Sequence, residues 1–240
     1  MSTEKEQLGR YAHLVVAVVA ALSFGVLGGC TAAPGQTDAG SRTADPAAAG
    51  QMDAAATGVP DDVLREMRTL TERYRDVKAA EADGYIRDPL DYCVTAAFEG
   101  QPPQLGGMGI HYFRPDLLQI TATAPRIDGA GTHTDFLKPA VLIYEPQADG
   151  SLALVAVENL VFQKAWHDAG HSAPPEFQGN QYYSMIDNPL TDVDEAHMFQ
   201  PHYELHVWLY RDNPNGLFAQ FNPNVTCEHH RGPTHMTHGG

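Results

Sequence analysis

The spacing of apolar residues predicts one long helix at the start of the folded part of the chain. From Pro60 to Gly84 the apolar residues lie three or four positions apart, at Val63, Leu64, Met67, Leu70 and Tyr74. Such spacing places an apolar stripe along one side of an α-helix. Acidic residues at the start suggest Asp61 or Asp62 as the cap, and Gly84 is a typical end. We expect a break near Asp76.

Beyond this helix the pattern changes to short runs of β-branched and aromatic residues separated by Pro and Gly. Strands are expected at Gly109–Phe113, Ala140–Tyr144, Leu152–Phe162, Tyr203–Tyr210 and Leu217–Phe221. The sequences QADGS and RDNPNG are typical of hairpin turns, with Gly216 supplying a positive φ. The predicted fold class is therefore α+β: an N-terminal helix packed on a mainly antiparallel sheet, for which a cupin-like or sandwich barrel is one form.

The predicted strand at residues 203–210 separates two kinds of side chain. Tyr203, Leu205, Val207 and Leu209 would share an apolar face, because successive side chains in a strand alternate between faces. The opposite face would carry His202, Glu204, His206, Trp208 and Tyr210. A helix would also align the two histidines, as in some zinc sites, but the aromatic and β-branched residues favour a strand. On a strand the two lie about 13 Å apart, too far to bind one ion.

Two residues in other predicted strands could complete a metal site with His206. His111 lies within GIHYF, and Glu158 lies within the apolar run LVAVENLVF. A carboxylate in such a run is costly unless it meets a cation or strong donors. Two histidines and one carboxylate suit zinc, or iron with open positions. The alternative is that the histidines are ordinary core or rim residues and that Glu158 faces water.

The residues around this predicted site are assigned supporting roles. His202 and Glu204 would flank the ligands, and Trp208, Tyr112 and Tyr210 would form the walls of the pocket. No catalytic residue is assigned, since the chain has no Gly-rich phosphate loop and no Gly-x-Ser-x-Gly motif. The expected cofactor is a divalent transition metal: zinc, copper or iron.

The first 59 residues predict export and attachment to a membrane. A basic start and the apolar run YAHLVVAVVAALSFGVLGG favour a signal peptide at residues 1–29, with an uncleaved anchor as the alternative. The sequence LGGC favours lipidation of Cys30, which gives a lipid-anchored protein on the extracytoplasmic face of the cell envelope. Residues 30–59 are rich in Ala, Gly, Thr and Pro and are expected to form a disordered tether. One α+β domain follows at residues 60–228.

Histidines outside the predicted strands are weaker candidates for metal ligands. The stretch of residues 229–240 holds His229, His230, His235 and His238 among Gly and Pro, and we expect a disordered tail. His167 and His171 lie four positions apart, but Pro174 and Pro175 follow closely, so we expect a loop there.

Charge and cysteine content limit the partners and the compartment. The net charge is −15, from 30 acidic and 15 basic residues without a basic run, which disfavours nucleic acid as a partner. Two cysteines lie in the domain, Cys93 and Cys227, and outside the cytoplasm an even pair favours a disulfide over two free thiols.

Three blocks of the domain are similar to a known group of proteins: GMGIHYFRPDLL, PAVLIYEP with LALVAVENLVF, and HYELHVWLYRDNPNGLFAQFNPNVTC. With them the chain resembles a family of exported bacterial proteins of uncharacterised function, over roughly Arg73 to Cys227. The resemblance implies an exported domain with these limits and supports the pairing of Cys93 with Cys227. It implies no activity.

The sequence thus leads to two hypotheses about function. The first is an extracytoplasmic lipoprotein whose β domain binds a divalent metal, for storage, delivery or chemistry. The second is a metal-free, lipid-tethered module that binds a ligand or a protein through its aromatic face.

Overall fold

The computed structural model describes residues 58–232. The predicted signal peptide, Cys30, almost all of the tether and most of the histidine tail lie outside the described residues. None of the described helices is long and apolar enough to cross a membrane.

The N-terminal helical segment is broken where the sequence predicted. It consists of α2 (Asp61–Thr71), the 3-10 helix η1 (Glu72–Arg75) and α3 (Val77–Ala82). The break occurs at Asp76, whose side chain accepts a hydrogen bond from the backbone N–H of Lys78 and so caps α3. The predicted caps of the first helix were wrong: α2 begins after Pro60, and no side chain caps it. Proline before the first turn already fixes φ in a range compatible with entry into a helix.

The main sheet is antiparallel throughout and has seven strands. Its order is β1-β3-β6-β7-β11-β10, and β2 also pairs with β3. The strands are β1 (Ile86–Arg87), β2 (Cys93–Thr95), β3 (Gly107–Phe113), β6 (Val141–Pro146), β7 (Leu152–Phe162), β10 (Tyr183–Met185) and β11 (His202–Val207). Among the described residues the strand order is open-ended, so the barrel form is not closed. The α+β class is confirmed.

Short elements connect these strands. They are η2 (Pro103–Leu105), α4 (Pro115–Leu118), β4 (Ile120–Ala122), β5 (Asp128–Gly129), α5 (Gln163–Asp168), β8 (Glu176–Phe177) and β9 (Asn180–Gln181). The two strand pairs β4–β5 and β8–β9 form separate two-stranded sheets.

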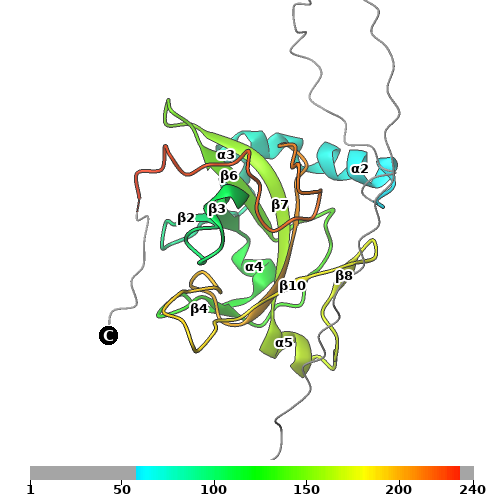
Figure 1. Ribbon diagram of the computed structural model, residues 1–240. Coiled ribbons are helices and arrows are strands. Elements are labelled where there is room, and N and C mark those ends of the chain that lie inside the picture. Colours follow the sequence, from blue (N-terminus) through cyan, green and yellow to red (C-terminus); the bar gives the residue numbers. More distant parts are fainter. Residues whose placement is uncertain (1–57, 233–240) are drawn as a thin grey trace, which may run out of the picture. The chain divides into compact units, whose positions relative to one another are not determined.

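The curved main sheet buries a hydrophobic cluster on each face. On one face, Leu64 and Met67 of α2 pack with Leu205 and Val207 of β11, and we call this group the helix-side cluster. The opposite face of the sheet carries the concave layer. On the other face, Leu118 of α4 packs within a cluster that also contains side chains of β3, β6 and β7. Figure 1 shows β7 curving through the molecule, with α4 and β4 on its concave side. In the buried strands β3, β6 and β11, side-chain alternation therefore divides the residues between two buried layers.

The last predicted hairpin forms only in part. The first strand, β11, ends at Val207, and residues 217–221 form no strand. The turn itself is present: Gly216 has φ +112°, and the N–H of Trp208 donates to the carbonyl oxygen of Leu217. The N–H of Leu209 turns back to the carbonyl of Val207. This local bond ends the strand at Val207. Trp208 and Leu209 still lie on their predicted faces, whereas Tyr210 packs on the opposite one.

Cys93 and Cys227 form a disulfide, with a sequence separation of 134 residues. The bond ties β2 to the C-terminal segment. In the chain-entropy model, closing so long a loop contributes about 5 kcal/mol to stability by restricting the unfolded chain.

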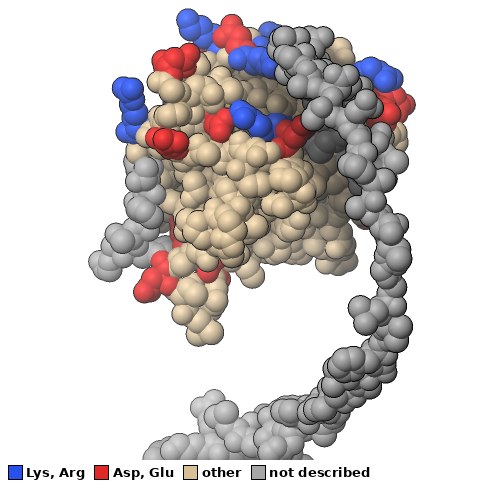
Figure 2. All heavy atoms as spheres, turned by 45° about the horizontal axis from the view of Figure 1, so that its top comes forward, with Lys and Arg blue, Asp and Glu red and all other residues tan. Residues whose placement is uncertain are grey.

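Charged residues are mixed by sign on the surface. On the face shown in Figure 2, Lys and Arg side chains lie next to Asp and Glu side chains toward one end, and a large part of the face is uncharged. Ion pairs such as Arg73–Asp83 and Arg114–Asp116 contribute to this mixing.

Candidate metal centre

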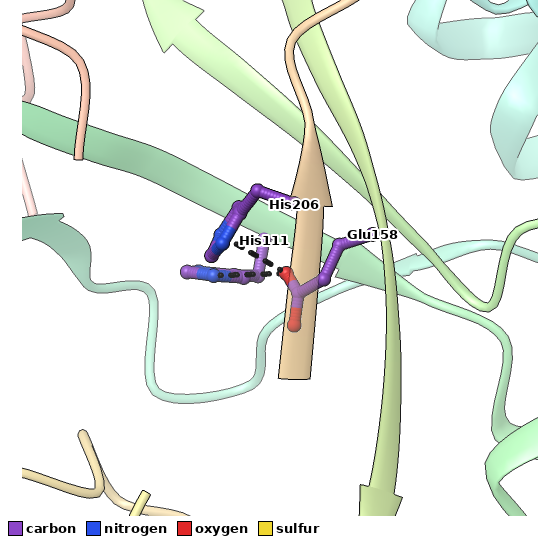
Figure 3. Close-up of side chains that lie close together, drawn as sticks. All are labelled: His111, Glu158 and His206. Atoms are coloured by element: carbon purple, nitrogen blue, oxygen red, sulfur yellow. Dashed lines mark ion pairs between the residues drawn. The ribbon is translucent and has the colours of Figure 1, made fainter. Parts of the chain in front are cut away.

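Three neighbouring regions of the sheet bring His111, Glu158 and His206 together. His206 on β11 lies directly opposite Glu158 on β7, and β6 separates β7 from His111 on β3. All three side chains point to the concave layer, because each alternates with residues of the helix-side cluster. Figure 3 shows the two imidazole rings directed at the Glu158 carboxylate.

The ligand atoms of this first group converge on one carboxylate oxygen. The Nε2 atoms of His111 and His206 each lie 3.5 Å from Oε2 of Glu158. One ligand atom from each residue lies within 4.8 Å of the others. Neither Nε2 atom makes a hydrogen bond, and neither oxygen of Glu158 does so. A bound cation would give these unpartnered buried atoms a partner, so the first group could hold a metal ion.

Burial controls the protonation of these three residues. The exposed fraction is 2% for the side chain of His111 and 0% for those of Glu158 and His206. Burial lowers the pKa of His111 well below its usual range and lowers the pKa of His206 to about 4. Burial, with the nearby Glu204 charge, raises the pKa of Glu158 well above its usual range. The histidines are therefore neutral at pH 7, which is the form that binds metals.

Of the three predicted wall residues, only Trp208 lies beside the site. Its ring stacks on that of His206, with centroids 5.8 Å apart, and its Nε1–H donates to the carbonyl of Ala219. Tyr112 and Tyr210 belong to the helix-side cluster instead. For Tyr112 the reason is its alternation with His111. For Tyr210 it is the early end of β11, which lets its hydroxyl approach Thr71 on α2.

The two predicted flanking residues belong to a second buried group. His202 and Glu204 lie on the same face of β11 as His206, and His197 approaches them from the segment between β10 and β11. The pKa of Glu204, which burial alone would raise, falls below its usual range beside His197 and His202. The pKa of His197, which burial would lower, rises to about 10 beside Glu204 and Glu99. His197 was not predicted from the sequence, because it lies in a turn, where no periodic pattern marks a buried residue.

Other histidines make ordinary contacts. His167 lies in α5, a short helix where a loop was expected, and its Nδ1 faces the carbonyl of His171. Nε2 of His230 lies 2.8 Å from the carbonyl oxygen of Asp91, so the described start of the tail packs against the domain.

Comparison of the chain with protein-family models, with curated proteins and with solved structures finds no match. The site is therefore interpreted from its own geometry, as two adjacent buried groups of histidine and glutamate side chains.

Proposed function

We propose that this protein is a metal-binding lipoprotein of the cell envelope, in which His111, Glu158 and His206 hold a divalent transition ion. The observation that carries the proposal is the approach of two histidine Nε2 atoms, from separate strands, to the same unpartnered oxygen of Glu158. A buried carboxylate without donors costs several kcal/mol, which a bound ion would offset.

The ligand types favour zinc or iron(II) over copper(I). The first group offers two imidazole nitrogens and a carboxylate and contains no thiolate or thioether, the donors that select copper(I). Three protein ligands leave at least one coordination position for water or another small ligand. The complete burial of the ligands favours an ion that is held tightly and exchanged slowly.

The alternative hypothesis, a metal-free module with an aromatic contact surface, has less support. Trp208 is 0% and Tyr112 is 3% exposed, so neither side chain is available to a partner on the surface. The large apolar residues that are exposed, such as Leu190 and Ile186, do not belong to the predicted aromatic face.

Metal analysis of the purified chain tests the proposal. Changing His229, His235 and His238 to alanine first removes adventitious binding by the tail. In this background, after incubation with zinc and removal of loosely bound ions, His206→Ala should lower the zinc content by one ion per chain. The matched control is His171→Ala, which removes an exposed histidine and should leave the content unchanged. A zinc content that is the same in His206→Ala and its parent, or zero in both, would sink the proposal.

A further inference from the structure

The second buried group repeats the arrangement of ligand atoms in the first. Nε2 of His202 lies 3.2 Å and Nε2 of His197 lies 3.5 Å from the same atom, Oε2 of Glu204. The side chains of the three residues are at most 1% exposed, and one ligand atom from each lies within 4.8 Å of the others. Two imidazole nitrogens thus surround one carboxylate oxygen here too.

The other ring nitrogen of each histidine faces an oxygen acceptor. Nδ1 of His202 lies 3.0 Å from the carbonyl oxygen of Gln200, which can only accept, so this Nδ1 carries the proton. Nδ1 of His197 lies 3.2 Å from Oε1 of Glu99, which is itself 2% exposed. In metal sites the ligating histidine commonly donates its distal N–H to a carbonyl or carboxylate, which orients the ring and makes it a better ligand.

This arrangement leaves two acceptors facing each other. Because the His202 proton is on Nδ1 in the neutral ring, its Nε2 presents a lone pair to the Glu204 carboxylate. A lone pair and an anion repel at 3.2 Å unless a cation lies between them or close to both. A proton or a metal ion could fill this role, and the three converging ligand atoms match a metal ion.

The backbone around His197 is held in an unfavourable conformation that directs its ring inward. His197 has φ +36° and Met198 has φ +74°, both in the region that favours glycine. The Met198 N–H donates to Oδ2 of Asp194, whose other oxygen pairs with Arg126. Strained residues of this kind commonly occur at functional sites.

The two groups are direct neighbours. The rings of His111 and His197 stack, with centroids 5.6 Å apart. Nδ1 of His206 lies 3.9 Å from Oε1 of Glu204, so the carboxylate of the second group lies on the far side of the His206 ring from Glu158. Glu204 is therefore close to the ligands of both groups.

The buried charges are also compatible with two cations. The three carboxylates Glu99, Glu158 and Glu204 are at most 2% exposed. One divalent ion leaves a net negative charge on this buried cluster, whereas two divalent ions with one bound hydroxide make it neutral. Burying an unbalanced charge is expensive. A single ion with a proton on His197 would also give neutrality, so stoichiometry distinguishes the two cases.

We infer that His197, His202 and Glu204 form a second site for a divalent transition ion, oriented by Glu99 and Gln200, next to the first. The site itself uses none of the three ligands of the proposed function. Only its description as half of a two-metal centre rests on that function.

Zinc stoichiometry of the full chain, with the tail histidines His229, His235 and His238 changed to alanine, tests the inference. We expect two ions per chain in this parent, one in His202→Ala, one in His111→Ala and none in the double variant. The His171→Ala control should retain two. One ion in the parent that persists in His202→Ala would overturn the second site. One ion that is lost in His202→Ala but kept in His111→Ala would instead overturn the first site alone.

A measurement on the parent alone covers the case in which a variant fails to fold. Titration with Co²⁺, followed by its visible absorption, should give a band that grows until two equivalents have been added. Saturation at one equivalent, or the absence of a band, would contradict a second site.

Discussion

At the residue scale, Glu158 is the strongest single indication of function. Its position among aliphatic residues marks it in the sequence, and the strand register places it opposite His206. Strand alternation could therefore predict His111, Glu158 and His206 as partners. It could not predict His197 or Glu99, because both lie in turns, where side-chain direction depends on tertiary contacts. His202 and His206, which lie about 13 Å apart along a regular strand, belong to different groups and do not share an ion site.

Replacing Glu158 by glutamine should change both the pH dependence of stability and the stabilisation by metal. The folded pKa of Glu158 is raised above its ordinary value of 4.5, so the folded metal-free protein retains a proton that the unfolded chain releases. Stability is therefore lost as pH rises above 4.5, by up to about 1.4 kcal/mol per pH unit. In the presence of a chelator, the stability of Glu158→Gln relative to the parent should increase as the pH rises. Zinc at a hundredfold excess over Kd should stabilise the parent by about 3 kcal/mol and should stabilise Glu158→Gln by less.

Denaturant unfolding at pH 5 and pH 8, with chelator or with zinc, gives both comparisons. The control is Glu145→Gln, because this buried carboxylate is already satisfied by Arg211 and by the N–H of Thr226. That variant should be destabilised under all four conditions. If zinc stabilised Glu158→Gln as much as the parent, a role of this carboxylate as ligand would be excluded.

At the element scale, regular hydrophobic periodicity predicted where the main helix and strands lie, but it did not predict where each of them ends. The strand at Leu152–Phe162 and the break at Asp76 follow the sequence prediction. Tyr210 was misplaced because a single local hydrogen bond, from the N–H of Leu209 to the carbonyl of Val207, ends β11. Such a bond competes with the strand pattern and leaves no signal in the hydrophobic spacing.

The helix caps provide a test at this scale. Asp76→Ala removes the bond to the Lys78 N–H and should lower the free energy of unfolding by about 1 kcal/mol. Asp62→Ala, at an exposed position of α2 whose side chain forms no cap, should change it by less than about 0.5 kcal/mol. Chemical denaturation in chelator measures both. Equal losses in the two variants would contradict the assignment of Asp76 as the cap.

At the scale of the whole molecule, the sheet keeps two functions apart. Its helix-side cluster stabilises the packing of α2, and its concave layer carries the histidines and glutamates. The hydrophobic pattern predicted the α+β class, because an amphipathic helix and alternating strands both require buried layers. The approach of the two buried groups to each other could not be predicted in the same way, since it depends on strand order and on the segment that carries His197.

The location of bound metal in a crystal of the zinc-loaded full chain tests the central claim most directly. Anomalous scattering at the zinc edge should show a peak about 2.0–2.2 Å from Nε2 of His111, Nε2 of His206 and an oxygen of Glu158. An anomalous map with no peak among these three atoms, or with zinc bound only by the tail histidines, would contradict the account.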